Sequence, residues 1–237
     1  MDQAKREEIL KLFEGLRVTD VNDALDTVGL TNIMIMDRNI RPLWRDIENF
    51  KHRFVGFAVT YRYLPSNLGP IPKTDYATYK KEKSRRYNEE SPESFANILQ
   101  KGDVVVIDCY TNTDVGFSGS MNTYAWINSG AVGVVTNGGC RDTDELIKQE
   151  IPVYSAYIGR GIRPGRIMAD QLNVPVNVGG ALVRPGDLIV ADGDGVVVVP
   201  IEHVQAVADA AWDIANDDKG ARRKEYEKAG REPDFTI

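Results

Sequence analysis

The sequence predicts an α/β protein in which stacked mixed sheets are flanked by helices. Short runs of β-branched residues recur along the chain and alternate with amphipathic segments at helical spacing. The apolar runs 104–108 and 132–135, with a helical segment between them, predict a β–α–β unit. No internal repeat, low-complexity tract or linker divides the sequence, so we expect a single α/β domain over residues 1–237.

Composition and charge restrict the class of protein. With 237 residues, of which 42% are hydrophobic and 27% charged, the chain has the composition of an ordinary globular domain. Its formal net charge of −6 argues against a general nucleic-acid surface, which is normally basic. No stretch approaches the roughly 20 apolar residues that cross a membrane. The amino terminus has no signal-peptide core, and Cys109 and Cys140 lack metal-type spacing, so we expect reduced thiols in a cytoplasmic protein.

The first 61 residues are predicted to form two helices and a strand. From residue 3 to about residue 15, apolar side chains recur at helical spacing, and Gly15 is a stop signal. Thr19 is predicted to cap a second helix, which Gly29 ends. The segment 55–61 is rich in β-branched and aromatic residues and is predicted to be a strand.

The segment 64–91 differs in character from the rest of the chain. Prolines interrupt its first part, and basic residues then alternate with Tyr76, Tyr79 and Tyr87. Three interpretations are open. The segment is a solvated helix or flap with its tyrosines on the domain, a surface for single-stranded nucleic acid, or a cover that brings a cation to an acidic substrate. The acidic balance of the whole chain favours the first.

Two predicted elements lead into the candidate site. Ser91 and Pro92 predict a helix start. The residues expected on the buried face of this helix are Phe95, Ile98 and Leu99. The continuous apolar run 104–108 then predicts a strand that is buried on both faces.

The stretch 116–142 contains the candidate functional site. A glycine-marked turn precedes a predicted helix, at whose start free backbone N–H groups and the helix dipole favour an anion. The residues at this helix start are Gly119, Ser120, Met121 and Asn122. After the strand 132–135, a second glycine-rich turn is expected to end in Arg141 and Asp142. A guanidinium and a carboxylate beside an anion-binding helix start suit a carboxylate substrate held against a divalent metal.

Simpler structural interpretations compete with these functional ones. Arg141 and Asp142 could merely cap the short helix predicted from Thr143, and Cys140 is expected to be a small residue that fills a tight turn. The aspartates of the segment 192–195 could ligate a cation. That segment lacks the ligand series of a calcium loop, so we favour a hairpin turn between two strands.

The remaining residues predict short strands and one long helix. A strand is expected to begin at Ile151, and a tightly turned pair of strands is expected over 175–183. Apolar residues from Glu202 to Ala215 define a long amphipathic helix. The organisation is thus a core over 18–212, a basic, tyrosine-rich insertion at 64–91 and a charged tail at 213–237.

Many short motifs recur in an order that carries a resemblance. They are Asp20–Leu25, Gly56–Thr60, Gly102–Asp108, Gly119, Gly130–Val135, Gly138, Arg141–Asp142, Pro152–Val153, Pro175–Val176, Gly179–Gly180, Val183–Asp192 and Asp194–Pro200. Together they resemble the family that includes 4-hydroxy-4-methyl-2-oxoglutarate (HMG/CHA) aldolase and the regulator of ribonuclease activity A. The resemblance covers most of residues 18–212.

The resemblance implies a fold, an assembly and a site. The fold is a swivelling β/β/α domain, assembled as homotrimers or homohexamers with sites at subunit boundaries. Backbone amides from Gly119 to Asn122 would hold the α-keto acid substrate, Arg141 would bind its oxygens, and Asp142 would ligate Mg²⁺ or Mn²⁺. The implied activity is that of a carbon–carbon lyase, by retro-aldol cleavage that releases pyruvate or by decarboxylation of the oxaloacetate type.

The sequence departs from the family pattern at two places. Ser120 stands where the family usually has an acidic residue, and the substitutes considered are Asp108, Asp114 and a neighbouring subunit's Asp217 or Asp218. The second departure is the segment 64–91, which is longer than expected between these motifs. The two departures indicate a different substrate and leave open a related sugar-acid lyase or hydratase.

A non-catalytic regulator of the ribonuclease-regulator type is the alternative to an enzyme. The regulator branch of the family lacks the acidic residue that follows the arginine, whereas Asp142 is present here. The sequence therefore favours the enzyme, with a small-molecule α-keto acid rather than a nucleic acid as its partner.

Overall fold

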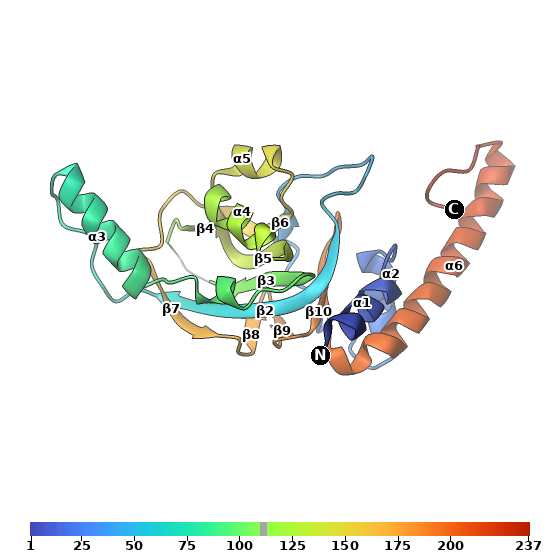
Figure 1. The fold of residues 1–237 in the computed structure, drawn as a ribbon. Helices are drawn as coiled ribbons and strands as arrows, with labels where there is room; N and C mark the ends of the chain where they lie inside the picture. The colour runs from blue at the N-terminus through green and yellow to red at the C-terminus, as the bar shows by residue number, and fades with distance from the viewer. Residues whose placement is uncertain (110–112) are drawn as a thin grey trace.

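The computed structural model describes residues 1–109 and 113–237 of the chain. They form a mixed α/β structure in which a curved nine-stranded sheet is flanked by helices and by a two-stranded ribbon (Figure 1). The predicted α/β class, with mixed sheets and flanking helices, is confirmed. Among the described helices, none combines the length and the apolar character that a bilayer crossing requires.

The elements alternate along most of the chain. The helices are α1 (Gln3–Leu12), α2 (Val18–Asp26), α3 (Tyr76–Glu89), α4 (Ser120–Asn128), α5 (Thr143–Lys148) and α6 (Val204–Ala229), with 3₁₀ turns η1 (Ser94–Asn97) and η2 (Ile201–His203). The strands are β1 (Arg41–Pro42), β2 (Phe54–Pro65), β3 (Asp103–Asp108), β4 (Gly116–Ser118), β5 (Ala131–Cys140), β6 (Val153–Ile158), β7 (Ile167–Leu172), β8 (Val176–Val178), β9 (Ala181–Val183), β10 (Leu188–Asp192) and β11 (Gly195–Val199).

The large sheet is parallel at its centre and antiparallel at its edges. Its strand order is β1-β6-β5-β3-β2-β10-β11, with β4 paired to β5 and β7 paired to β2. The pairs β2–β3, β3–β5 and β5–β6 are parallel, whereas β10 pairs antiparallel with both β2 and β11. Because parallel central strands are covered on both faces, β3 is a continuous buried run of valine and isoleucine, as predicted.

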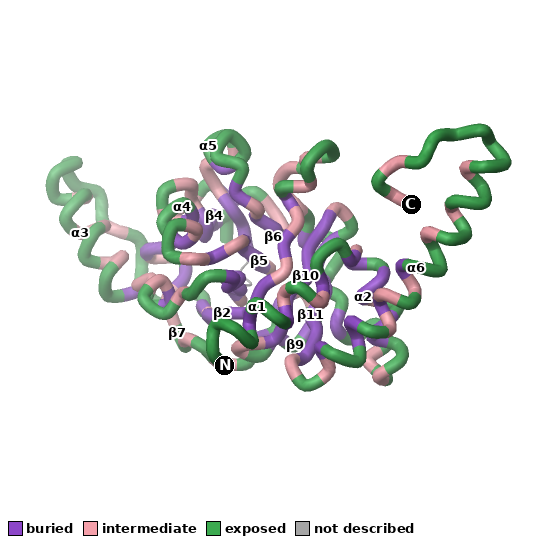
Figure 2. Tube along the Cα trace, turned by 45° about the vertical axis from the view of Figure 1, so that its right-hand side comes forward, coloured by how far each residue is buried: buried purple, intermediate pink, exposed green. Residues whose placement is uncertain are grey.

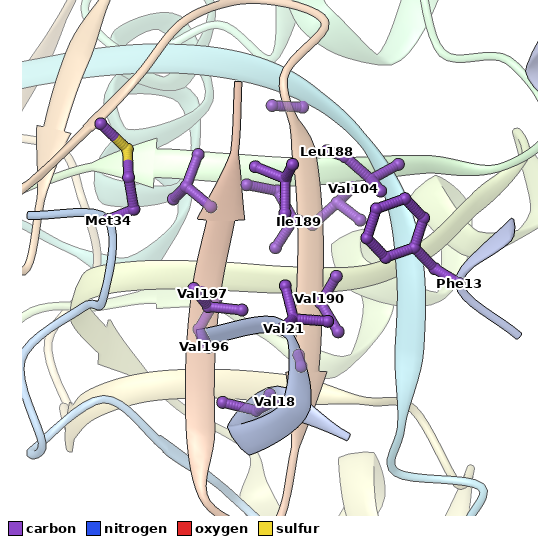
Figure 3. Packing of buried hydrophobic residues seen from close by; sticks show 14 of the residues in the cluster. Phe13, Val18, Val21, Met34, Val104, Leu188, Ile189, Val190, Val196 and Val197 are labelled. Carbon is purple, nitrogen blue, oxygen red and sulfur yellow. The ribbon is translucent and has the colours of Figure 1, made fainter. Parts of the chain in front are cut away.

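Two hydrophobic clusters cover the two faces of the sheet. Val104 and Val106 of β3 belong to one cluster and Val105 and Ile107 to the other, as the alternation of side chains along a strand requires. The first cluster packs α1, α2 and α6 against β10 and β11. Figure 3 shows Val18 and Val21 of α2 beside these two strands. The second cluster contains the fully buried Trp126 of α4, and it therefore fixes the position of this helix on the sheet.

Several predicted boundaries were wrong at the amino-terminal side of the chain. Helix α2 is capped by Arg17 rather than Thr19, because the Asp20 carboxylate accepts a hydrogen bond from the Arg17 N–H at 2.9 Å. The helix expected after Ser91 is the short 3₁₀ turn η1. Phe95 is fully buried as expected, but Ile98 is exposed because the turn ends before a helical face can form.

Other differences concern the strands and the last helix. The glycine-rich residues 137–140 continue β5 rather than forming a turn, because β4 pairs with them. Strand β7 was not predicted. Helix α6 continues to Ala229, so most of the segment expected as a charged tail is helical, with its second half exposed (Figure 2).

The two predicted strand pairs of the carboxyl-terminal half are confirmed. β8 pairs with β9 across two glycines, and β10 pairs with β11 as a hairpin. Within the hairpin, the Asp192 carboxylate accepts hydrogen bonds from the N–H groups of Val18 and Asp194, at 2.9 and 2.8 Å. Asp192 therefore ties the turn to the start of α2, and these contacts support the hairpin rather than a cation site.

The basic segment forms α3, which extends from one end of the molecule (Figure 1). The helix contains no buried residue, and Tyr76 is 75% exposed. Tyr79 and Tyr87 are half-buried. The solvated-helix interpretation thus describes most of α3, while Tyr87 lies where α3 returns to the body of the protein.

Candidate active site

The strand that pairs with one edge of β5 changes from β3 to β4 along its length, and this change creates the site. The first half of β5 lies between β3 and β6, but Gly139 and Cys140 pair with Gly116 and Ser118 of β4. A Cβ atom at Gly139 would lie 2.5 Å from the Val115 carbonyl oxygen, so β4 can approach only a glycine there. This pairing places the end of β5 beside the start of α4, as at the switch points where ligands bind in α/β proteins.

Arg141 is held against the backbone of β4. Its N–H donates to the Ser118 carbonyl oxygen at 2.8 Å. A Cβ atom at Gly116 would lie 2.5 Å from the Arg141 Cβ, so the glycine makes room for the stem of the arginine. The guanidinium is partly exposed and remains available to a ligand.

The Asp142 carboxylate faces the start of α4. Asp142 has a left-handed backbone, with φ of 54°, and although it occupies the cap position of α5 its side chain makes no capping hydrogen bond there. Its Oδ2 accepts from the Ser120 N–H at 3.2 Å, and its Oδ1 lies 3.3 Å from the Arg141 Nε. The pair therefore does more than cap the following helix, and the structure brings it together with the predicted helix start.

The predicted helix start is present at the expected residues. Gly119 is the residue before α4, and a Cβ atom on it would lie 2.8 Å from the Asp142 Oδ2. Among the described residues, no acceptor binds the N–H groups of Met121 and Asn122. The Met121 side chain is 83% exposed, whereas the Asn122 side chain donates to the Glu93 carboxylate at 2.5 Å.

Three further residues at the site were not predicted as functional. The Glu93 carboxylate accepts from Asn122, from the Trp126 indole N–H at 2.9 Å and from the buried guanidinium of Arg163. Arg163 also lies over the ring of Tyr87, the residue at which α3 approaches the site. A cavity of about 460 Å³ opens among these groups. No short motif marks them, because they come from three separate segments of the chain.

Two of the substitutes considered for the acid missing at Ser120, Asp108 and Asp114, bind other groups of the chain. A neighbouring subunit's Asp217 or Asp218 stays a prediction. Asp108 accepts hydrogen bonds from the Asn137 side chain and the Asn177 N–H, on the wall of a different cavity. Asp114 pairs with Arg160, whose backbone N–H and guanidinium lower the pKa of that carboxyl. Within the chain, Asp218 pairs with Arg17. Glu93 is instead the carboxylate that, besides Asp142, contacts the first turn of α4.

The donor set fits a hard, oxygen-preferring divalent cation better than a softer metal that prefers thiolate or imidazole ligands. No group of three histidine, cysteine or acidic side chains arranged for metal binding is present in residues 1–109 and 113–237. Among the described residues of the site, Asp142 is the suitable ligand, and its half-exposed carboxylate is positioned but not enclosed. Mg²⁺ and Mn²⁺ accept one or two carboxylates and complete their coordination with waters and substrate oxygens.

Both cysteines are free, buried thiols. Burial raises the pKa of Cys109 to about 12 and also raises the pKa of Cys140. The Cys140 sulfur accepts a hydrogen bond from the Ser155 hydroxyl at 3.2 Å. Cys140 therefore packs beneath the site as a small protonated residue and is a poor nucleophile.

Comparisons with known proteins identify the family of the chain. The family model of the RraA-like proteins, described as Aldolase/RraA, matches residues 18–198. A Halalkalibacterium halodurans protein named "Putative 4-hydroxy-4-methyl-2-oxoglutarate aldolase" is 29% identical over 225 residues, which are 94% of this chain and 90% of that protein. Protein DlpA of Legionella pneumophila is 24% identical over 199 residues, which are 84% of this chain. The chain spans only 28% of the length of DlpA.

A solved structure shares the fold. Streptomyces coelicolor RraAS2, described as an unusual member of the RNase ES inhibitor RraA protein family, superposes with a TM-score of 0.72 at 23% sequence identity. The superposition covers 92% of this chain and 98% of that one. At this identity, the likeness concerns the fold.

Proposed function

The chain belongs to the RraA-like family, and from that premise we propose that it is a divalent-metal-dependent lyase acting on an α-keto acid. The proposed reaction is retro-aldol cleavage of a 4-hydroxy-2-oxo acid to pyruvate and a carbonyl product. Decarboxylation of oxaloacetate is the second reaction that the same groups would support, because both reactions leave the electron pair of the broken bond on the carbon next to the keto group.

The orientation of Asp142 is the observation that carries the proposal. Its carboxylate lies between Arg141 and the start of α4, at 3.3 Å from the Arg141 Nε and 3.2 Å from the Ser120 N–H. A carboxylate with only a helix-capping role would instead bind the free N–H groups of α5. The glycines at 116 and 119 leave room for this arrangement.

Each group has a distinct role in the proposed reaction. Arg141 would bind the carboxylate and keto oxygens of the substrate by charge-assisted hydrogen bonds. The N–H groups of Met121 and Asn122 would hold the same end of the substrate at the helix start. Asp142 would hold Mg²⁺ or Mn²⁺, which when bound supplies Lewis-acid stabilisation of the negative charge that develops on the keto oxygen.

In the proposed retro-aldol step, the bond between carbons 3 and 4 breaks, and its electron pair passes to carbon 3 as the enolate of pyruvate. The hydroxyl group on carbon 4 loses its proton to a solvent water and becomes the carbonyl of the second product. A proton taken up from solvent at carbon 3 completes pyruvate. Arg141, fixed on β4, would neutralise the charge that forms on the substrate oxygens.

The test is pyruvate release by the purified protein. We expect release from at least one 4-hydroxy-2-oxo acid or from oxaloacetate with Mg²⁺ or Mn²⁺, and loss of that activity after chelation. Asp142→Asn should lower kcat/KM by at least about 100-fold, because an amide oxygen is a far weaker ligand for a hard cation. A coupled lactate dehydrogenase assay measures the pyruvate.

Asp144→Asn is the matched control. Asp144 lies two residues away, in the first turn of α5, and is exposed. This variant should retain the activity of the unaltered protein. An Asp142→Asn protein that keeps metal-dependent activity would place the metal elsewhere, and no turnover of a broad keto-acid panel would contradict the lyase.

A non-catalytic binding protein is the second candidate, and α3 is the observation that favours it. This helix is basic and aromatic, contains no buried residue and extends from the body of the protein. Such a surface suits an acidic partner. Salt-sensitive binding to ribonuclease E or to RNA, without any keto-acid turnover, would support a regulator over an enzyme.

A further inference from the structure

The cavity of about 460 Å³ that contains Glu93 and Arg163 forms a polar chamber beside Arg141 and Asp142. It lies between the end of α3, the segment 91–93 and the first turn of α4. Its polar lining consists of Tyr87, Asn88, Ser91, Glu93, Asn122 and Arg163. A water molecule in liquid occupies roughly 30 Å³, so the chamber is large enough for a fragment of several carbon and oxygen atoms.

Arg163 is built into the wall of this chamber. The residue is 3% exposed, and its guanidinium carbon lies 4.9 Å from the centre of the Phe117 ring and 5.1 Å from that of the Tyr87 ring. One of its terminal nitrogens pairs with the Glu93 carboxylate. The stacking and the ion pair together fix the guanidinium in one orientation.

Two buried polar atoms in the chamber wall have no partner. Within the described residues, the Nη1 of Arg163 and the Oγ of Ser91 make no hydrogen bond, although Ser91 is 0% exposed. Buried polar atoms in native proteins are nearly always hydrogen-bonded, since leaving one unpaired costs roughly 1–3 kcal/mol. Both residues line the chamber. Both atoms are covered in the empty chamber, so a polar group that entered it would supply the missing bonds after the Ser91 hydroxyl and the guanidinium turn toward it.

The chamber adjoins the proposed active site along two elements. Arg141 packs on Gly116 of β4, and Arg163 lies over Phe117, the next residue of that strand. In α4, Asn122 contributes its N–H to the helix start and its side chain to the chamber wall. Tyr87 lies under the Arg163 guanidinium. Burial raises the pKa of Tyr87, and the positive charges of Arg163 and Arg141 oppose that shift.

The charge of the lining indicates the chemistry of the occupant. Arg163 and Glu93 form an ion pair, so the charged groups that line the chamber sum to zero. The unused groups are the two N–H donors on Nη1 of Arg163 and the Ser91 hydroxyl, beside the neutral Tyr87 phenol and the Asn88 amide. A second carboxylate would have to compete with Glu93 for Arg163, whereas an alcohol can both accept from Arg163 and donate to Ser91.

We propose that this chamber is a subsite for the hydroxylated tail of the substrate, beyond the bond that is cleaved. The proposed lyase therefore acts on 2-oxo acids whose remaining carbon chain bears hydroxyl groups. This inference rests on the proposed function for the position of the keto acid, but the binding of the tail is measurable without any turnover.

The binding experiment uses acids that cannot be cleaved. 2-Oxohexanoate and 5,6-dihydroxy-2-oxohexanoate both lack the hydroxyl group on carbon 4. The dihydroxy acid closes in part to a cyclic hemiketal, so each Kd is referred to the concentration of the open keto form, measured by NMR, and the open forms differ only in their tails. With Mg²⁺ present, isothermal titration calorimetry should give a Kd about tenfold lower for the dihydroxy acid, as expected for one or two neutral hydrogen bonds to unpaired buried groups. A third acid, 2-oxohexanedioate, carries a carboxylate tail and should bind no better than 2-oxohexanoate.

Ser91→Ala should remove most of that tenfold preference. It should leave the Kd of 2-oxohexanoate unchanged, because this acid has no group to pair with the serine. Ser84→Ala, at an exposed position of α3, is the control and should keep the preference. If Ser91→Ala does not fold, Tyr87→Phe tests the same chamber from α3, and the preference should again fall.

The outcomes separate the subsite from the proposed function. Equal Kd values for the two neutral-tailed acids, or a preference for 2-oxohexanedioate, would overturn the subsite even if pyruvate is released. A dihydroxy preference that depends on Ser91 supports the subsite. If the corresponding 4-hydroxy acids then yield no pyruvate, the lyase fails while the subsite stands.

Discussion

The stretch 116–142 and the segment 64–91 are both unusual in composition, but they are built in opposite ways. In the first, a Cβ atom on Gly116, Gly119 or Gly139 would lie 2.5 to 2.8 Å from a neighbouring atom. In the second, a Cβ atom on Gly69 would meet no atom within 4 Å, and α3 contains no buried residue. Close packing thus fixes the side chains of the first region, whereas most residues of the second region can be substituted without disturbing the fold.

The two regions meet where α3 ends. Arg86 pairs with the buried Glu90, whose backbone carbonyl accepts a hydrogen bond from Ala169 of β7 at 2.7 Å. Tyr87 lies beneath Arg163 at the chamber. On the proposed function, catalysis belongs to the packed region, and contact with the substrate tail belongs to the last turn of α3.

Arg141→Lys should have the largest effect among the tests of this comparison. Lysine keeps the charge but lacks the planar pair of N–H groups that matches a carboxylate. We expect kcat/KM for pyruvate release to fall by about 100-fold, a size typical of losing one preorganised charge-stabilising donor. Because the side chain is partly exposed, the unfolding temperature should change little.

Arg160→Lys is the control for that change. Arg160 is a highly exposed arginine that pairs with Asp114 on a neighbouring loop. Its substitution should leave kcat/KM unaltered. Equal losses in the two variants would show that the activity is sensitive to arginine-to-lysine changes in general and would break the contrast between the regions.

Gly119→Ala should have an intermediate effect. The backbone at Gly119 has a φ of −98°, which alanine adopts without strain, so the change acts through the added methyl group alone. That methyl group would lie 2.8 Å from the Asp142 Oδ2 and would displace the carboxylate. We expect the Mg²⁺ concentration for half-maximal activity to rise by about tenfold, as for other groups that position a metal ligand.

Gly69→Ala is the same change made in the exposed segment. Nothing lies within 4 Å of the added atom, so metal dependence should not change. A Gly119→Ala protein with unaltered metal dependence would show that the Asp142 carboxylate does not need its observed position.

The sequence predicted those parts of the fold in which the type of each residue follows directly from its own burial or from its place in a turn. The run 104–108 is apolar because both faces of β3 are buried, and the hairpins at β8–β9 and β10–β11 are marked by glycines in their turns. The cap of α2 was misplaced because Arg17 is not a usual capping residue. The capping acceptor is instead the Asp20 carboxylate, which binds the Arg17 N–H at the start of α2.

The candidate site was predictable only in part. Arg141, Asp142 and the helix start at Gly119 are close in sequence and carry recognisable chemistry, and the structure brings them together. Glu93 and Arg163 are 70 residues apart and meet only through the tertiary fold. The extension of β5 through 137–140 was missed because β4, a strand of three residues, gives no pattern of its own.

The smallest effect is expected from the exposed face of α3. Lys80 and Lys81 are exposed, and no hydrogen bond or ion pair within the described residues involves either side chain. The double change Lys80→Ala and Lys81→Ala should alter the free energy of unfolding by less than about 0.5 kcal/mol, since surface substitutions away from specific contacts rarely do more. Urea unfolding measures the free energy of unfolding, and the pyruvate assay measures kcat/KM.

Tyr87→Phe, seven residues along the same helix from Lys80, is the contrast, because it should reduce the preference for a hydroxylated tail. If the lysine pair instead lowers kcat/KM as much as Arg141→Lys, then α3 supplies a cation to the substrate, and the division between a catalytic packed region and a solvated helix is wrong.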